Sequence, residues 1–144
     1  MPNQSPDTID RLPQLANFRF RLRQFLAYSE STCEESGVTM QQYQLLQVLG
    51  AARMEADAAR TTISALAERL LLRHNSAVEL VDRAERAGLV RRVADPTDHR
   101  RAVVEITPHG QELLAKLTGE HLSYLATAAP ELASSLQELL PSQR

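Results

Sequence analysis

Residues 81–110 read VDRAERAGLVRRVADPTDHRRAVVEITPHG, and this stretch decides the fold. Its first part repeats apolar residues at three- and four-residue steps, which predicts a helix that Gly88 terminates. The period then changes to short, valine-rich runs over 89–94 and 102–107, which predict two strands. The turn-forming and charged residues 95–101 between them predict a hairpin with a charged tip.

Helical patterns precede this hairpin. A capping box at Thr39–Gln42 predicts a helix to about Ala52, and residues 53–60 lack an apolar face and are expected to form a loop. A short helix capped by Thr61 or Thr62 and a turn over 71–75 then lead into a helix over about 75–87. Two short helices joined by a tight turn form a helix-turn-helix, and a hairpin directly after it serves as a wing.

The two ends of the chain predict further helices. Residues 9–36 carry one long apolar face, with a loose tail before it from Met1 to about Thr8. Residues 108–140 begin with a threonine–proline cap, and Pro130 is expected to break this segment into a long helix and a short last one. These faces are too apolar for a lone small domain, so we expect them to pair with a second copy of the chain.

Length and composition exclude several classes of function. The chain has 144 residues, enough for one domain, and contains neither an apolar run that could span a membrane nor a signal peptide, so we expect a cytoplasmic protein. The single cysteine, Cys33, excludes an intramolecular disulfide and a cysteine-rich zinc site. No phosphate-binding glycine loop, HExxH sequence or nucleophile elbow is present. We therefore expect no enzyme and no cofactor or metal.

Charge is distributed unevenly. The net charge is -2, but residues 60–103 contain nine arginines against six acids, while the rest of the chain is net acidic. Fifteen of the sixteen basic residues are arginine, which suits contacts to phosphate and guanine, although a GC-rich genome explains this bias equally well. The basic middle favours nucleic acid as the partner. The net acidity favours the alternative, a winged-helix module that binds another protein rather than DNA.

Four runs, over 63–70, 81–92, 95–101 and 106–110, resemble the signature of the MarR family of transcription regulators. The resemblance implies a mainly α fold with a small β-hairpin wing, a winged helix-turn-helix flanked by N- and C-terminal dimerisation helices. The whole chain, 1–144, is then one domain, in which 9–36 and 108–140 form the dimerisation helices and 39–107 the DNA-binding lobe. It further implies a homodimeric repressor of a nearby gene that binds a palindromic DNA operator and is released by a small ligand.

The resemblance also assigns a DNA-binding set. Asp98 is expected to orient Arg100 into a minor groove, with a plain hairpin salt bridge as the alternative. Residues at the start of the second helix are expected to read bases, or else to form a solvated polar face; Arg83 either anchors a phosphate or pairs with Asp82 or Glu79. The full set is Thr62, Ser64, Arg73, His74, Asn75, Ser76, Glu79, Arg83, Asp98, His99, Arg100 and Arg101.

Dimer and ligand residues follow from the same resemblance. The predicted dimer interface consists of Leu15, Phe18, Leu22, Leu117, Leu125, Leu132 and Leu136. Residues that could contact a small aromatic effector are Phe25, Tyr28, Tyr43 and His121, for which ordinary core packing is the simpler alternative. Cys33 is expected to be inert, because redox-sensing members of the family carry their cysteine earlier in the first helix.

Overall fold

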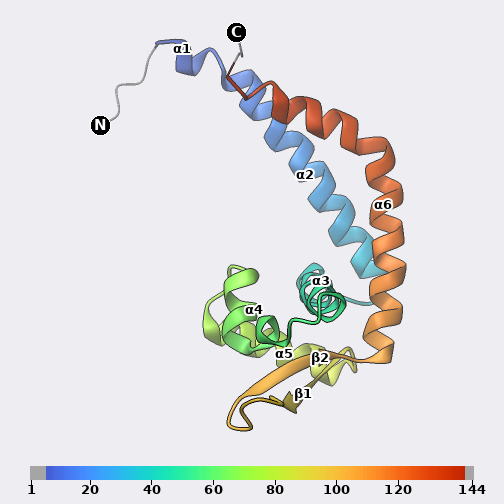
Figure 1. Ribbon diagram of the computed structural model, residues 1–144. Helices are drawn as coiled ribbons and strands as arrows, with labels where there is room; N and C mark the ends of the chain where they lie inside the picture. The colour runs from blue at the N-terminus through green and yellow to red at the C-terminus, as the bar shows by residue number, and fades with distance from the viewer. Residues whose placement is uncertain (1–5, 142–144) are drawn as a thin grey trace. The chain divides into compact units, whose positions relative to one another are not determined.

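The computed structural model describes residues 6–141 and is mainly helical, with one antiparallel pair of strands (Figure 1). In chain order the elements are α1 (Pro6–Ile9), α2 (Leu12–Glu35), α3 (Met40–Met54), the 3-10 helix η1 (Ala58–Thr61), α4 (Ile63–Arg69), α5 (His74–Arg86), β1 (Val90–Ala94), β2 (Ala102–Ile106) and α6 (Pro108–Gln137). Within residues 6–141, no helix combines the length and apolar character needed to cross a membrane.

The chain divides into two compact units. The winged unit is Thr32–Gly119, and the helical unit contains the residues up to Ser31 together with those from Glu120 onward. The boundary falls inside α2 and inside α6, so each of these helices contributes to both units. The predicted DNA-binding lobe, 39–107, lies wholly within the winged unit, whereas the assignment of 1–144 to one domain stays a prediction.

The core of the winged unit is built from leucine and valine side chains on every one of its main elements. Leu45, Leu66, Leu80, Val90 and Leu117 are each 2% exposed or less and belong to one cluster. A fully buried leucine contributes about 1.5–3 kcal/mol to folding, so these contacts outweigh any single surface interaction. They hold α4, α5 and the hairpin on one shared core.

The local signals in the sequence are confirmed at three helix ends. In the capping box, the backbone nitrogen of Gln42 donates to Thr39 Oγ1 and that of Thr39 donates to Gln42 Oε1, each at 3.0 Å. Thr62, not Thr61, caps α4, and its hydroxyl oxygen accepts from Ala65 N at 3.2 Å. Gly88 has φ +77°, the left-handed conformation that ends α5 and turns the chain into β1.

The hairpin is confirmed, with β1 pairing β2 from Val90↔Ile106 to Ala94↔Ala102. Thr107 fastens its base. The Thr107 hydroxyl donates to the Gly88 carbonyl at 2.6 Å and accepts from Gly110 N at 3.1 Å, and Thr107 N donates to the Leu89 carbonyl at 3.0 Å. One residue therefore joins the end of α5, the end of β2 and the first turn of α6.

Two predictions at the ends of the chain are wrong. Residues Pro6–Ile9 form the short helix α1 rather than a loose tail, while residues 1–5 of that predicted tail lie outside the described part. Pro130 does not break the C-terminal segment, because α6 continues through it to Gln137. In the helical unit α6 packs along α2, where Arg21 pairs with Glu131, the residue after the proline, at 2.9 Å.

Candidate nucleic-acid interface

The helix-turn-helix consists of α4, a tight turn and α5. The turn closes when Leu72 N donates to the Ala67 carbonyl at 2.8 Å. Leu71 sits at its apex with φ +56°, and 92% of its surface is exposed. A left-handed leucine costs about 1–2 kcal/mol relative to its usual conformation, so the turn carries local strain. It nevertheless sets the angle at which α5 leaves α4.

One face of α5 is buried and the opposite face is free. Ala77, Leu80, Val81 and Ala84 are each at most 2% exposed and anchor the helix on the core. The predicted DNA-binding residues at its N-cap and along the helix are all exposed: Arg73, His74, Asn75, Ser76, Glu79 and Arg83. They offer donors and acceptors of the kinds that read base edges in a major groove.

Arg83 makes no ion pair with any residue in the range 6–141, so neither pairing considered for it, with Asp82 or with Glu79, occurs. The Asp82 carboxylate instead accepts from Arg92. Arg83 is exposed in the last turn of α5, where its guanidinium is available to a phosphate.

The wing tip is organised by two aspartates. Asp98 Oδ1 accepts from the Arg100 backbone nitrogen and from Arg100 Nε, each at 3.1 Å. The Arg100 side chain is 90% exposed, so this contact orients it without burying it. Asp95 accepts from the backbone and hydroxyl of Thr97, and these hydrogen bonds, the backbone one first, lower the pKa of its carboxyl group. His99 and Arg101 are also exposed at this tip.

Thr62 and Ser64 lie at the first turn of α4 with different surroundings. Thr62 is buried and its hydroxyl oxygen is used in capping, whereas Ser64 is exposed. The Thr62 hydroxyl therefore caps α4, and Ser64 is the exposed residue of the two.

Arg92 on β1 is a structural residue that the sequence analysis missed. Its Nη2 donates to Asp82 Oδ1 at 2.7 Å and its Nη1 donates to Glu85 Oε1 at 2.8 Å. The hydrogen bond to Asp82 is the main reason that the pKa of Arg92 is raised. The signal was present, because two acids three residues apart share a helix face, but the sequence does not say which of several arginines meets them.

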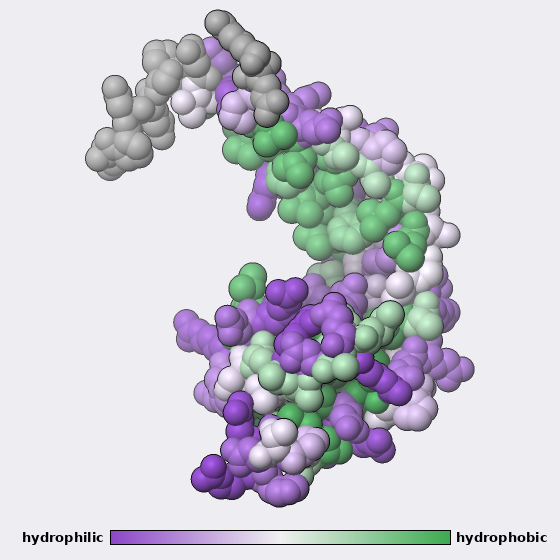
Figure 2. All heavy atoms as spheres, in the orientation of Figure 1, coloured by the Kyte–Doolittle hydropathy of each residue, from purple (hydrophilic) through white to green (hydrophobic). Residues whose placement is uncertain are grey.

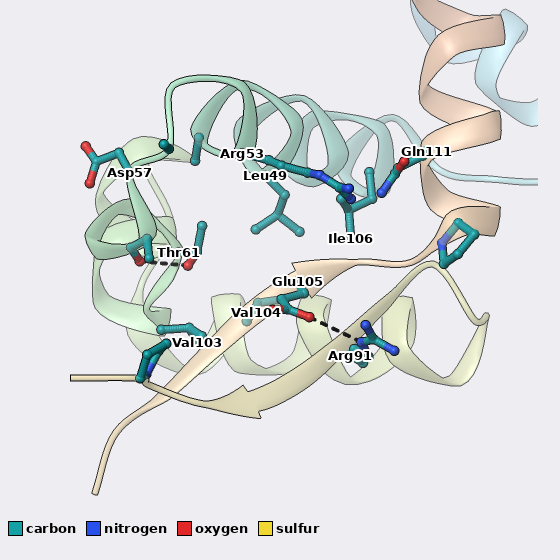
Figure 3. Close-up of a pocket in the computed structure, with 15 residues that line it drawn as sticks. Leu49, Arg53, Asp57, Thr61, Arg91, Val103, Val104, Glu105, Ile106 and Gln111 are labelled. Atoms are coloured by element: carbon teal, nitrogen blue, oxygen red, sulfur yellow. Dashed lines mark hydrogen bonds and ion pairs between the residues drawn. The ribbon is translucent and has the colours of Figure 1, made fainter. Parts of the chain in front are cut away.

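A pocket of about 610 Å³ lies on the winged unit between α3, η1 and β2 (Figure 3). Its rim carries Arg53, Asp57 and Gln111, together with Arg91, which pairs with Glu105 at 3.3 Å. The floor is supplied by Leu49, Ala52, Val103, Val104 and Ile106, none of them more than 5% exposed.

The predicted ligand residues do not form one group. Phe25, Tyr28 and His121 pack together in the helical unit with Tyr124, which stacks on Tyr28 with ring centroids 4.0 Å apart. His121 Nε2 lies 2.8 Å from Ser29 Oγ, so its ring is held in place. Tyr43 belongs to the core of the winged unit, which agrees with ordinary packing. Cys33 is fully buried in the same core.

Apolar side chains gather on the surface of the helical unit over α2 and α6, as the green area in Figure 2 shows. Of the predicted dimer residues, Leu15 and Leu136 are exposed, and Phe18, Leu22, Leu125 and Leu132 are half-buried. Leu117 is different, because it is completely buried in the core of the winged unit and cannot reach a partner chain. Its place in the interface was a wrong prediction.

Comparisons with known proteins agree with this geometry. A model described as the MarR family matches residues 36–101. A curated protein of Thauera aromatica, named "Putative transcriptional regulatory protein for hcr operon", is 31% identical over 99 residues, which are 69% of this chain. The match spans 56% of that relative, so the present chain corresponds to little more than half of its length.

Solved structures share the fold. The MarR family regulator AbsC of Streptomyces coelicolor superposes with a TM-score of 0.73 at 23% identity, over 96% of this chain and 90% of its own. MepR, a transcription regulator of a multidrug efflux pump of Staphylococcus aureus, superposes with a TM-score of 0.70 at 22% identity, over 79% of this chain and 80% of its own. A MepR mutant bound to an oligodeoxyribonucleotide gives 0.62 at 22% identity, over 87% and 82%.

Proposed function

We propose that this chain, whose residues 36–101 match the MarR family of transcription regulators, binds double-stranded DNA sequence-specifically as a homodimer. The observation that carries the proposal is the pairing of an exposed polar face on α5 with a wing whose Arg100 is 90% exposed and held by Asp98. A winged-helix module for protein binding does not require an oriented arginine at the wing tip.

In this proposal the two elements read two grooves. The outer face of α5, with Asn75, Ser76 and Glu79, enters the major groove, where such side chains discriminate base pairs. Arg100 enters the adjacent minor groove, whose negative potential attracts a guanidinium most strongly where the groove is narrow. Arg73, Arg83 and Ser64 contact phosphates and set the register of the protein on the duplex.

The helical unit supplies the dimer interface. Its exposed apolar residues are Ile9, Leu12, Leu15, Phe20, Leu26, Leu122, Leu136 and Leu140. A contiguous apolar surface of this kind is typical of a protein interaction site. Twofold pairing places two α5 helices about one DNA turn apart, roughly 34 Å, which matches a palindromic operator.

The proposal includes repression of a nearby gene, with release by a small aromatic ligand. This part rests on the family resemblance, and the relative from Thauera aromatica, named for an operon, supports a local regulatory role. The site of action is the cytoplasm, where bacterial DNA lies.

Selection of bound sequences from a random DNA pool tests the DNA-binding part. The wild-type protein is expected to enrich a palindrome, and Arg100→Ala is expected to enrich it weakly or not at all. Arg91→Ala is the matched control, because Arg91 lies on the same hairpin but pairs with Glu105 and is not at the tip. Enrichment of no sequence at low salt, by protein with and without aromatic ligands, would favour the protein-binding module.

Light scattering tests the dimer. The 16.0 kDa chain is expected to have an apparent mass of about 32 kDa at micromolar concentration. Leu15→Asp places a charge on the apolar face and is expected to give monomers, whereas Met54→Asp, at an exposed residue of α3, is not. A monomeric wild-type protein would refute the homodimer.

A further inference from the structure

Three side chains tie α5 to the wing at a point away from the chain connection. Arg92 on β1 donates from its two terminal nitrogens to Asp82 and Glu85, and its backbone nitrogen donates to Glu85 Oε2 at 3.0 Å. The two acids lie three residues apart on α5 and so present neighbouring carboxylates. The planar guanidinium bridges both at once, which a lysine ammonium does less well.

The position of Arg92 along the strand matters. Side chains alternate between the faces of a strand, so Arg92 shares a face with Val90, which is buried in the core. Val90 holds the base of the hairpin on the core, and Arg92, two residues further along β1, attaches the hairpin to α5 nearer the tip. Among the described residues, 6–141, no other ion pair joins α5 to the hairpin.

We propose that Arg92 is a positioning residue that fixes the orientation of the wing relative to α5, so that both elements meet their grooves at the same time. This inference rests on the proposed DNA-binding function. A short turn at Gly88 connects the two elements, and the base of the hairpin packs in the shared core; the Arg92 pairs add an attachment nearer the tip, where the core does not hold the hairpin. Holding binding groups in their final geometry before binding removes an ordering cost that would otherwise weaken the complex.

Folding stability gives a poor explanation for this arrangement. The three side chains are 30–46% exposed, and ion pairs at such exposure contribute little to stability. Carboxylates on a DNA-binding helix also repel phosphates, so Asp82 and Glu85 oppose binding by charge alone. The two acids are accounted for if their orienting of the wing through Arg92 raises DNA affinity by more than their repulsion of phosphates lowers it.

Neutralising the two acids changes DNA affinity in opposite directions according to whether positioning or charge repulsion dominates. Asp82→Asn with Glu85→Gln removes two negative charges, so simple electrostatics predicts tighter binding to every DNA. The positioning role predicts about tenfold weaker binding to the selected operator, with equal or tighter binding to unrelated DNA. Glu105→Gln is the control, since it removes an acid that pairs with Arg91 on the hairpin and leaves the Arg92 pairs intact. Tighter operator binding by the double variant would overturn the proposal.

A measurement without DNA keeps the inference separate from the proposed function. Spin labels at Ser76→Cys on α5 and His99→Cys at the wing tip report the distance between these elements, and the buried Cys33 is left in place. Arg92→Ala is expected to broaden the distance distribution, and Arg92→Lys to broaden it partly, while Arg91→Ala leaves it unchanged. A distribution that Arg92→Ala does not change would overturn the restraint. Broadening in a protein that binds no DNA would overturn the proposed function and leave the restraint standing.

Discussion

Asp98 holds Arg100 at two points, because one carboxylate oxygen accepts from both the backbone nitrogen and Nε of the arginine, each at 3.1 Å. The Arg100 side chain is otherwise exposed, so this contact restricts its direction rather than burying it. An arginine whose rotamers are already restricted loses less entropy when it enters a groove.

Asp98→Ala is therefore expected to weaken operator binding by about 1.4 kcal/mol, or tenfold, although it removes a negative charge. Its free energy of unfolding is expected to change by less than about 0.5 kcal/mol, because the pair is exposed. Fluorescence anisotropy with the selected operator and urea denaturation provide the two measurements. Glu105→Ala, which removes another acid of the hairpin, controls for charge; unchanged affinity of Asp98→Ala would contradict the orienting role.

Leu71 offers a test of stored strain. Leu71→Gly is expected to raise the free energy of unfolding by about 0.5–1 kcal/mol, because glycine adopts φ +56° without the steric cost that leucine bears. The 92% exposed side chain contributes little packing that could be lost. Urea denaturation measures the change, and Ala56→Gly, at φ +53°, is expected to follow in the same direction. Destabilisation of both variants would show that the left-handed conformations are not strained.

Two glycines of α6 are expected to respond oppositely to alanine. At Gly110 a Cβ would overlap the Leu89 carbonyl oxygen and lie 2.9 Å from Ile106 Cγ1, so Gly110→Ala is expected to destabilise the protein by about 1–3 kcal/mol. At Gly119 a Cβ meets nothing within 4 Å, and Gly119→Ala is expected to stabilise it by up to about 1 kcal/mol. Thermal unfolding of the pair checks both signs. A stable Gly110→Ala variant would contradict the close approach of α6 to the end of α5.

The pKa of Asp95 predicts a pH dependence at the wing. Its carboxyl pKa is lowered in the folded protein by hydrogen bonds from Thr97. Because this pKa is lower in the folded protein, the ionised carboxylate stabilises the fold at pH above its unfolded pKa, near 3.8. That stabilisation is lost as the pH falls through the pKa of the folded protein. An NMR titration is expected to place the Asp95 midpoint below that of an unfolded peptide. Thr97→Ala removes the hydroxyl donor and is expected to move the midpoint upward, and a midpoint that stays in place would show that the hydroxyl does not contribute.

Elements specified by neighbouring residues were predictable from the sequence. The capping box at Thr39 and the left-handed Gly88 depend on contacts within a few positions, and both were located correctly. The wing was also predictable, since valine-rich runs on either side of a turn-rich tip favour a hairpin.

Features that depend on distant partners were not predictable. A proline within a helix costs about 3 kcal/mol, so the local sequence predicts a break at Pro130; α6 nevertheless continues, and its contacts with α2 are made by residues far away in the sequence. Helical periodicity likewise marked Leu117 as apolar but could not say whether its face meets the same chain or another one. The partner of Asp82 was missed for the same reason, because Arg92 lies ten positions away on a different element.

The scarcity of lysine determines how the proposed DNA-binding face can be controlled. Arg73, Arg83, Arg100 and Arg101 supply its positive charge, and the only lysine of the chain, Lys116, lies on α6. Guanidinium groups stay protonated at every physiological pH and are not substrates for lysine acetylation. If the proposed effector controls DNA affinity without changing these charges, it acts on shape, and the relative placement of α5 and the wing is then the quantity to regulate.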